Sequence, residues 1–137
     1  MQRTDFVKHS PRAVLQYQLA RLEAQGTEAF FGSELEFFLF KQTFEQAHAS
    51  GYTDLTPISP YNEDYHIFQT TKEEHVMRAV RTGLQGANVP VENSKGEADA
   101  GQAEINVRYA DALTMADRHV IIKNAVKEIA YTKGHAV

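Results

Sequence analysis

Two glutamates lie inside an otherwise almost wholly apolar segment at residues 30–40, FFGSELEFFLF. A segment this short and this rich in aromatic residues predicts a largely buried β-strand. Because side chains alternate between the two faces of a strand, Glu34 and Glu36 project from the same side. Two like charges this close repel each other and are costly to desolvate, unless a divalent cation such as magnesium or manganese lies between them. The segment therefore indicates either a metal site or an edge strand whose glutamate face is wet.

The bulk composition indicates one globular domain. The chain has 137 residues, of which 42% are hydrophobic and 23% are charged, and this suffices for a core of ordinary size. A net charge of −4 without any basic block argues against a nucleic-acid partner, and the lack of cysteine excludes disulfides and thiolate metal sites. The N-terminus lacks a secretory signal pattern, and no apolar run is long enough to span a bilayer. We therefore expect a cytoplasmic protein without a membrane partner.

Hydrophobic periodicity predicts the order helix, strand, short helix, long loop, helix, strand, strand, helix. The first helix begins at Ser10-Pro11 and should pack one apolar face on the core. The last begins after Asp111, and its inward-facing residues should be Leu113, Val120, Ile121, Ala125 and Ile129. Between them we expect a loop over 52–64, a helix from Thr70 or Thr71 to Gly86, a strand opening at 89–91, a turn over 94–101 and a strand over 103–109. A short turn joins the last two strands, so the fold class is α+β, with a mostly antiparallel sheet and helices packed on one face.

A second group of acidic residues occupies positions 92–104. Glu92 lies near the end of one strand, Glu97 in the turn, and Glu104 at the start of the next strand. A tight turn that contains glycine can aim Glu97 and Glu104 at a common point, as a hard cation with six or more oxygen ligands requires. Acidic residues at this spacing are also common in solvated hairpins, so a metal site and a solvated turn are both compatible with the pattern.

The two acidic motifs, 32–40 and 97–104, occur in this order and separation in the glutamine synthetase family, whose catalytic domain the chain resembles. The resemblance runs from the helix start at Pro11-Arg12, through the Tyr-Asn-Glu-Asp-Tyr loop at 61–65, to the segment 105–113. It implies that residues 1–137 form part of that domain, with an N-terminal β-grasp domain and a C-terminal part absent. The branch that it resembles holds glutamine synthetases beside ligases that use polyamines or other amines.

The resemblance implies an activity and a set of ligands. The family joins the γ-carboxylate of glutamate to ammonia or an amine and uses ATP through a γ-glutamyl phosphate. Carried over by motif, Glu36, Glu97 and Glu104 correspond to three carboxylates that hold one divalent ion, Mg²⁺ or Mn²⁺. Glu34 corresponds to a ligand of the second ion, and Glu92 to a residue beside the nucleotide. The motifs assign no catalytic residue, and the resemblance implies a homo-oligomeric ring in the full-length parent.

This sequence departs from the family pattern at two places and lacks some of its parts. Ala98-Asp99-Ala100 stands where many relatives have a bulkier residue and a proline, and Ala103 is small where a larger side chain is frequent. None of the six histidines lies in a His-x-His-x-Ser-like context. A histidine, a glutamate and an arginine-rich segment are therefore expected farther along the parent, and the isolated chain should lack ligase activity.

Two other functions fit parts of the pattern. A non-catalytic, structural or regulatory member of the family could keep the fold without the reaction, but such a protein has little reason to retain four costly carboxylates. A phosphotransferase such as a guanidino kinase has a related architecture. Those enzymes use arginines to hold the nucleotide, and this chain has no arginine cluster near its carboxylates.

Overall fold

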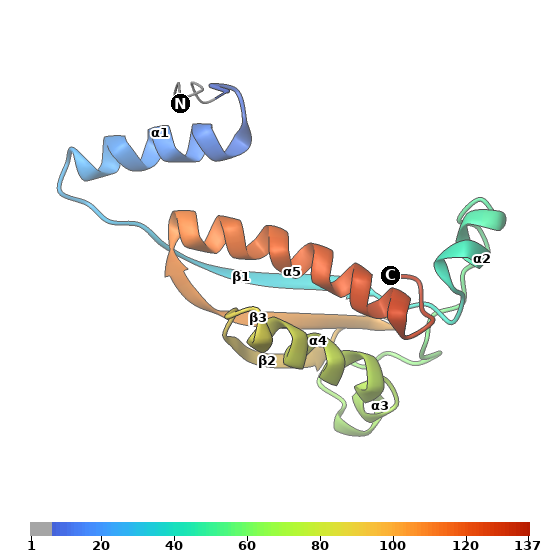
Figure 1. Cartoon of the computed structure of the whole chain (residues 1–137). Helices are drawn as coiled ribbons and strands as arrows, with labels where there is room; N and C mark the ends of the chain where they lie inside the picture. The colour runs from blue at the N-terminus through green and yellow to red at the C-terminus, as the bar shows by residue number, and fades with distance from the viewer. Residues whose placement is uncertain (1–6) are drawn as a thin grey trace.

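The structure is a computed structural model that describes residues 7–137, and its helices and strands are shown in Figure 1. The elements are α1 (Pro11–Glu23), β1 (Phe30–Phe38), α2 (Phe44–Ala49), α3 (Ile67–Thr71), α4 (Glu74–Gly86), β2 (Val91–Gly96), β3 (Gln102–Asp111) and α5 (Ala112–Thr132). Their order is the predicted one, with the short helix α3 in addition. Among the described residues, no helix is both long and apolar enough to cross a membrane.

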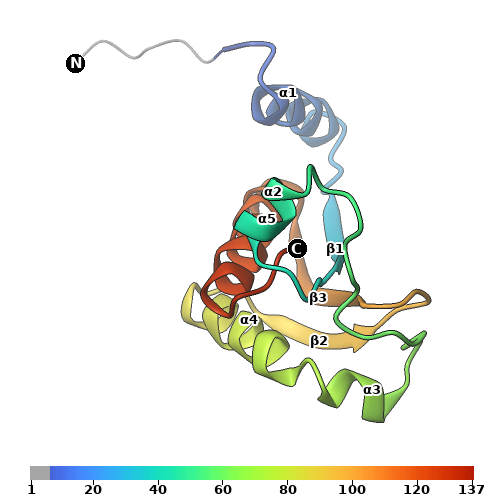
Figure 2. The same ribbon diagram turned by 90° about the vertical axis from the view of Figure 1, so that its right-hand side faces the viewer.

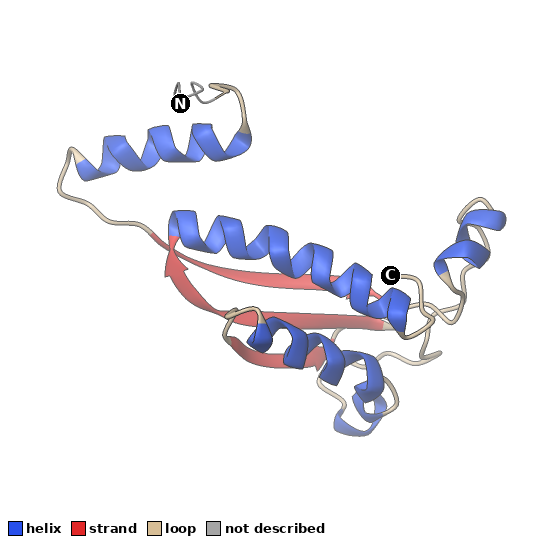
Figure 3. Cartoon of the chain, in the orientation of Figure 1, coloured by secondary structure: helices blue, strands red, loops and turns tan. Residues whose placement is uncertain are grey.

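In this part of the chain, three antiparallel strands form the sheet in the order β1-β3-β2, so β3 is the central strand (Figure 3). The predicted α+β class with a mostly antiparallel sheet is confirmed. The expectation that β1 is largely buried is wrong, because β1 lies at an edge and the helices cover only one of its faces. Phe31 is 49% exposed and Phe38 is 38% exposed. Aromatic content therefore overstated how deeply this strand is buried.

Helices α4 and α5 cover one face of the sheet, and the core lies between them and the strands (Figure 2). On α4, Val76, Val80 and Leu84 recur at helical spacing and are all buried, as their periodicity predicts. From the sheet, Ile105 and Val107 of β3 point into the same core. The alternate residues of β3 therefore project from the opposite face, which no long helix covers.

The prediction for the face of α1 is wrong, and the one for α5 is right only in part. Helix α1 has no buried residue, and an ion pair of 2.9 Å between Arg12 and Asp117 links it to α5. On α5, Ala125 and Ile129 pack against the core as predicted, but Val120 and Ile121 are exposed. The fully buried positions are Ala112, Met115, Ile122, Val126 and Ala130. Helix α5 carries apolar side chains on more than one side, so periodicity alone cannot identify the side that faces the sheet.

Two boundaries also differ from the prediction. Strand β2 continues to Gly96, inside the segment that was expected to be a turn, and pairs there with β3. Helix α4 begins after Glu73, which makes no side-chain capping bond, because Thr70 and Thr71 belong to the separate helix α3. Both threonine hydroxyls donate to the carbonyl of Ile67 inside that short helix.

Truncating the core should be costly. Leu84 is fully buried, so Leu84→Ala removes apolar contacts and leaves a cavity, and we expect a loss of about 2–5 kcal/mol in the free energy of unfolding. Urea unfolding followed by circular dichroism measures it. Val120→Ala is the control, because Val120 is 69% exposed and should change stability by less than about 0.5 kcal/mol. Equal losses in the two variants would contradict the described core.

Candidate metal centre

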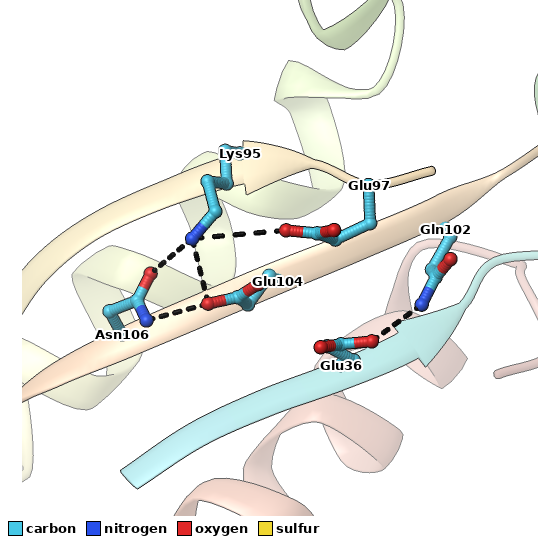
Figure 4. Close-up of polar contacts among 6 residues, drawn as sticks. All are labelled: Glu36, Lys95, Glu97, Gln102, Glu104 and Asn106. Carbon is cyan, nitrogen blue, oxygen red and sulfur yellow. Dashed lines mark hydrogen bonds and ion pairs between the residues drawn. The ribbon is translucent and has the colours of Figure 1, made fainter. Parts of the chain in front are cut away.

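Three carboxylates from separate segments converge on the open face of the sheet. Glu36 on β1 and Glu104 on β3 are directly paired across the ladder, and Glu97 lies in the turn that joins β2 to β3 (Figure 4). One carboxylate oxygen from each lies within 4.8 Å of the other two. Oxygens bound to one Mg²⁺ at about 2.1 Å lie at most about 4.2 Å apart, so small side-chain movements bring these three around a common ion.

Lys95 is a polar partner of this cluster that sequence reasoning missed. It is paired with Glu104 across the ladder between β2 and β3. Its ammonium group lies 2.8 Å from Oε1 of Glu104 and 3.8 Å from Oε1 of Glu97 (Figure 4). The signal for it was available, because Lys95 and Glu97 are two positions apart near the end of a strand and can share a face.

Two amides complete the hydrogen bonding around the carboxylates. Asn106 donates from Nδ2 to Oε1 of Glu104 over 2.6 Å, and Gln102 donates from Nε2 to Oε2 of Glu36 over 2.7 Å (Figure 4). Glu104 is only 2% exposed, so its charge depends on these partners. The amides orient the carboxylates and leave other oxygens of the cluster facing one another.

The electrostatics of the cluster separate Glu97 from Glu104. A hydrogen bond with Glu104, together with burial and repulsion from neighbouring carboxylates, raises the pKa of Glu97. Burial alone would raise the pKa of Glu104, but hydrogen bonds with Glu97, Lys95 and Asn106 outweigh it and hold that pKa below its usual value. The hydrogen bond to Glu104 also raises the pKa of Lys95. The ammonium group of Lys95 therefore balances negative charge where a metal ion could do so.

Glu34 and Glu92 lie outside the group of three. Glu34 is one pleat from Glu36 on the same face of β1, is paired with Asn106 across the ladder, and is exposed. Glu92 is on β2 next to an irregularity in the strand pairing, and it lines a pocket between β2 and α4 together with Arg81. The structure therefore brings together three of the five predicted site residues, whereas Glu34 lies one pleat away on β1 and Glu92 lies near the start of β2.

Hydrogen bonds hold the loop before α3 over the end of β2, next to the carboxylate cluster. The backbone N–H of Tyr65 donates to the carbonyl of Gly96, and Nδ2 of Asn62 donates to the carbonyl of Ala98. Gly96 has no room for a side chain, because an added Cβ would lie 2.6 Å from Cβ of Glu63. The close approach of loop and strand at this point holds Glu97 in its place.

Beneath this loop lies a second pair of carboxyl groups, which sequence reasoning missed. Glu63 from the loop and Glu73 before α4 are 0% and 1% exposed. Burial and the adjacent Glu63 carboxyl raise the pKa of Glu73 to about 8. At neutral pH, Glu73 therefore keeps its proton, which lets two buried acids lie together without two negative charges.

Known proteins resemble this chain over most of its length. A family profile described as "Glutamine synthetase, catalytic domain" matches residues 8–137. Gamma-glutamylethanolamide synthetase GlnA4 of Streptomyces coelicolor is 42% identical over 91% of this chain and 27% of that protein. Glutamate–isopropylamine ligase of a Pseudomonas species is 30% identical over 91% of this chain and 27% of that protein. The chain thus spans about a quarter of the length of these curated relatives.

Solved structures share the fold. The structure of GmaS without ligand superimposes with a TM-score of 0.79 and 28% identity, over 99% of this chain and 31% of that one. A complex of GmaS with ADP gives a TM-score of 0.77 and 29% identity, over 93% of this chain and 28% of that one. Because the family profile matches nearly the whole of this chain, the chain belongs to the glutamine synthetase family and lies within the catalytic domain of that family.

Proposed function

We propose that this chain supplies a divalent-cation site to an ATP-dependent ligase that joins the γ-carboxylate of glutamate to ammonia or a primary amine. The observation that carries the proposal is the convergence of Glu36, Glu97 and Glu104 from three separate segments to within 4.8 Å. An acidic group this compact and partly buried is stable only with positive charge beside it, and three carboxylate oxygens suit Mg²⁺ or Mn²⁺.

The residues of the proposed site have three roles. Glu36, Glu97 and Glu104 hold one ion, Glu34 contributes to a second, and Glu92 lies beside the nucleotide. Gln102 and Asn106 orient the carboxylates of Glu36 and Glu104 through the hydrogen bonds described above. When bound, the divalent ions neutralise the charge on the phosphoryl group in transfer and on the carboxylate that receives it.

The activities for which relatives are named support the reaction class. GlnA4 is named for γ-glutamylethanolamide synthesis, a second relative is named for isopropylamine, and GmaS has been solved with ADP. In the proposed reaction, an oxygen of the glutamate γ-carboxylate takes the γ-phosphoryl group of ATP and ADP leaves. The amine nitrogen then attacks the acyl phosphate carbon, loses a proton and expels inorganic phosphate. ATP, glutamate and the amine are thus the proposed small-molecule partners.

We expect the 137-residue chain alone to bind Mn²⁺ without turning over substrate. It spans about a quarter of the relatives' length, and the resemblance implies that a β-grasp domain and further ligands of the site lie outside these residues. The assay measures phosphate release with glutamate and ATP, with ammonia, ethanolamine or isopropylamine as acceptor, for this chain and for a full-length parent. Turnover by the short chain, or no turnover by the parent with any of these amines, would contradict the proposal.

A further inference from the structure

Lys95 occupies an unusual position for a cation in a candidate metal centre. Its ammonium group is 2.8 Å from Glu104 and 3.8 Å from Glu97, which are two of the three converging carboxylates (Figure 4). It also donates to Oδ1 of Asn106 over 3.2 Å and lies 5.6 Å from the ring centre of Tyr65. The side chain is 22% exposed, so one side of it faces solvent.

We propose that Lys95 is a tethered counter-ion that competes with the divalent cation for Glu97 and Glu104. Without metal, the ammonium group balances the charge of these carboxylates and keeps them together. When the metal binds, it displaces the ammonium group from them. This inference rests on the proposed metal site and adds to it a residue that sets how tightly the metal is held.

The distances favour the competition. An ion bound to Oε1 of Glu104 at about 2.1 Å lies no more than about 4.9 Å from an ammonium nitrogen that is itself 2.8 Å from the same oxygen. A monovalent and a divalent charge so close in a partly buried site repel each other strongly. The ammonium group sits at the end of a flexible four-carbon stem, so it can move away while the backbone of β2 stays paired.

The surroundings of Lys95 offer it a second position. The ring of Tyr65 belongs to the loop that is fastened over the end of β2, and an aromatic face attracts a cation. Displacement from Glu104 towards this ring keeps the charge near the site and out of the way of the metal. Because the lysine is part of the chain, its effective concentration does not fall on dilution, and it sets a lower limit on the metal concentration that fills the site.

Lys95→Gln tests the inference, because the two states of the site should respond in opposite directions. Without metal, the uncompensated carboxylates should lower the melting temperature. Mn²⁺ affinity, measured by calorimetric titration of the purified protein, should rise at least about tenfold. The expected rise is no larger because solvent screens the partly exposed charge of Lys95. Lys95→Arg keeps the charge and should bind Mn²⁺ nearly as the wild type does. A purely structural lysine would instead lower both stability and metal affinity.

Arg81→Gln is the matched control. Arg81 also donates to a residue of β2, Ser94, over 2.8 Å and pairs with Glu74, but within the described residues it forms no hydrogen bond or ion pair with the three carboxylates. Its loss should leave the Mn²⁺ affinity unchanged. If the wild type and Lys95→Gln both fail to bind Mn²⁺, the proposed metal site and this inference are overturned together. If the wild type binds Mn²⁺ and Lys95→Gln binds it no more tightly, only the inference is overturned.

A second measurement uses the unaltered protein. Displacement by metal should expose the amine, so saturating Mg²⁺ should increase the rate at which an acetylating reagent modifies Lys95, followed by peptide mass spectrometry. The exposed Lys123 on α5 provides the reference rate and should not respond. An unchanged ratio of the two rates on addition of Mg²⁺ would overturn the inference even if Lys95→Gln did not fold.

Discussion

Glu36→Gln should weaken Mn²⁺ binding by more than about a hundredfold and leave the metal-free fold as stable as the wild type. Loss of an outer-shell partner alone typically costs 10- to 100-fold in metal affinity, and this variant removes a proposed direct ligand. Glu36 is exposed and accepts one hydrogen bond, from Gln102, which the glutamine oxygen can also accept. In a full-length parent, activity should fall with the affinity and return, if at all, only at much higher Mg²⁺.

Glu104→Gln should give a different result, although it removes a ligand of the same ion. Glu104 is buried and accepts from both Lys95 and Asn106, so the neutral variant leaves the lysine with a weaker partner. We therefore expect a lower metal-free melting temperature as well as lost metal binding. Neutralising a carboxylate lowers repulsion only where no cation already balances it, and at Glu104 the cation is part of the protein.

Glu128→Gln is the control for both variants. Glu128 is exposed and accepts a hydrogen bond of 2.8 Å from Asn124, much as Glu36 accepts one from Gln102, but it lies on α5. Melting temperature without metal and calorimetric Mn²⁺ titration should both match the wild type. A lower melting temperature for Glu36→Gln, combined with unchanged metal affinity, would rule out the ligand assignment.

The buried carboxyl pair predicts a second large effect, on the pH dependence of stability. The pKa of Glu73 is raised to about 8 in the folded protein, whereas the unfolded chain has the ordinary value near 4.5. The folded state therefore holds one more proton between these two values, and stability falls as pH rises through this window. The slope for one proton is about 1.4 kcal/mol per pH unit. Urea unfolding at pH 5, 7 and 9 measures it.

Glu73→Gln should remove this part of the pH dependence. A glutamine is neutral at every pH and can still donate a hydrogen bond towards Glu63, so the variant should be more stable than the wild type at pH 9. Glu74→Gln is the matched control, since Glu74 is the next residue, is partly exposed and pairs with Arg81. It should keep the wild-type slope. Parallel slopes for wild type and Glu73→Gln would contradict the raised pKa of Glu73.

Much of the candidate site could be predicted from the sequence, because the patterns that place its residues span only a few positions. Alternation along a strand put Glu34 and Glu36 on one face, and a turn with glycine brought Glu97 near Glu104, as the structure confirms for these positions. The pairing of Glu36 with Glu104 is a long-range register, which no local pattern specifies. It became an expectation only through the family resemblance.

The errors arose where exposure depends on what lies beside an element. Phe31 and Phe38 predicted a buried strand, but β1 has a neighbour on one side only within the described sheet. Glu73 directly precedes α4, where the helix dipole favours an acid, yet the side chain is buried under the loop that contains Glu63. A sequence pattern gives the spacing of side chains, whereas burial is set by segments that are distant along the chain.

The strand order β1-β3-β2 implies an order of events in folding. Strands β2 and β3 form a local hairpin, so Glu97 and Glu104 can meet as soon as that turn closes. Glu36 arrives from β1, and its partner Gln102 is 66 residues away along the chain, a closure that is slower and entropically more costly. A metal bound by the hairpin alone would have two of its three ligands. Tight metal binding therefore requires that β1 has paired with β3. Measuring metal uptake during refolding would give the rate of that last step.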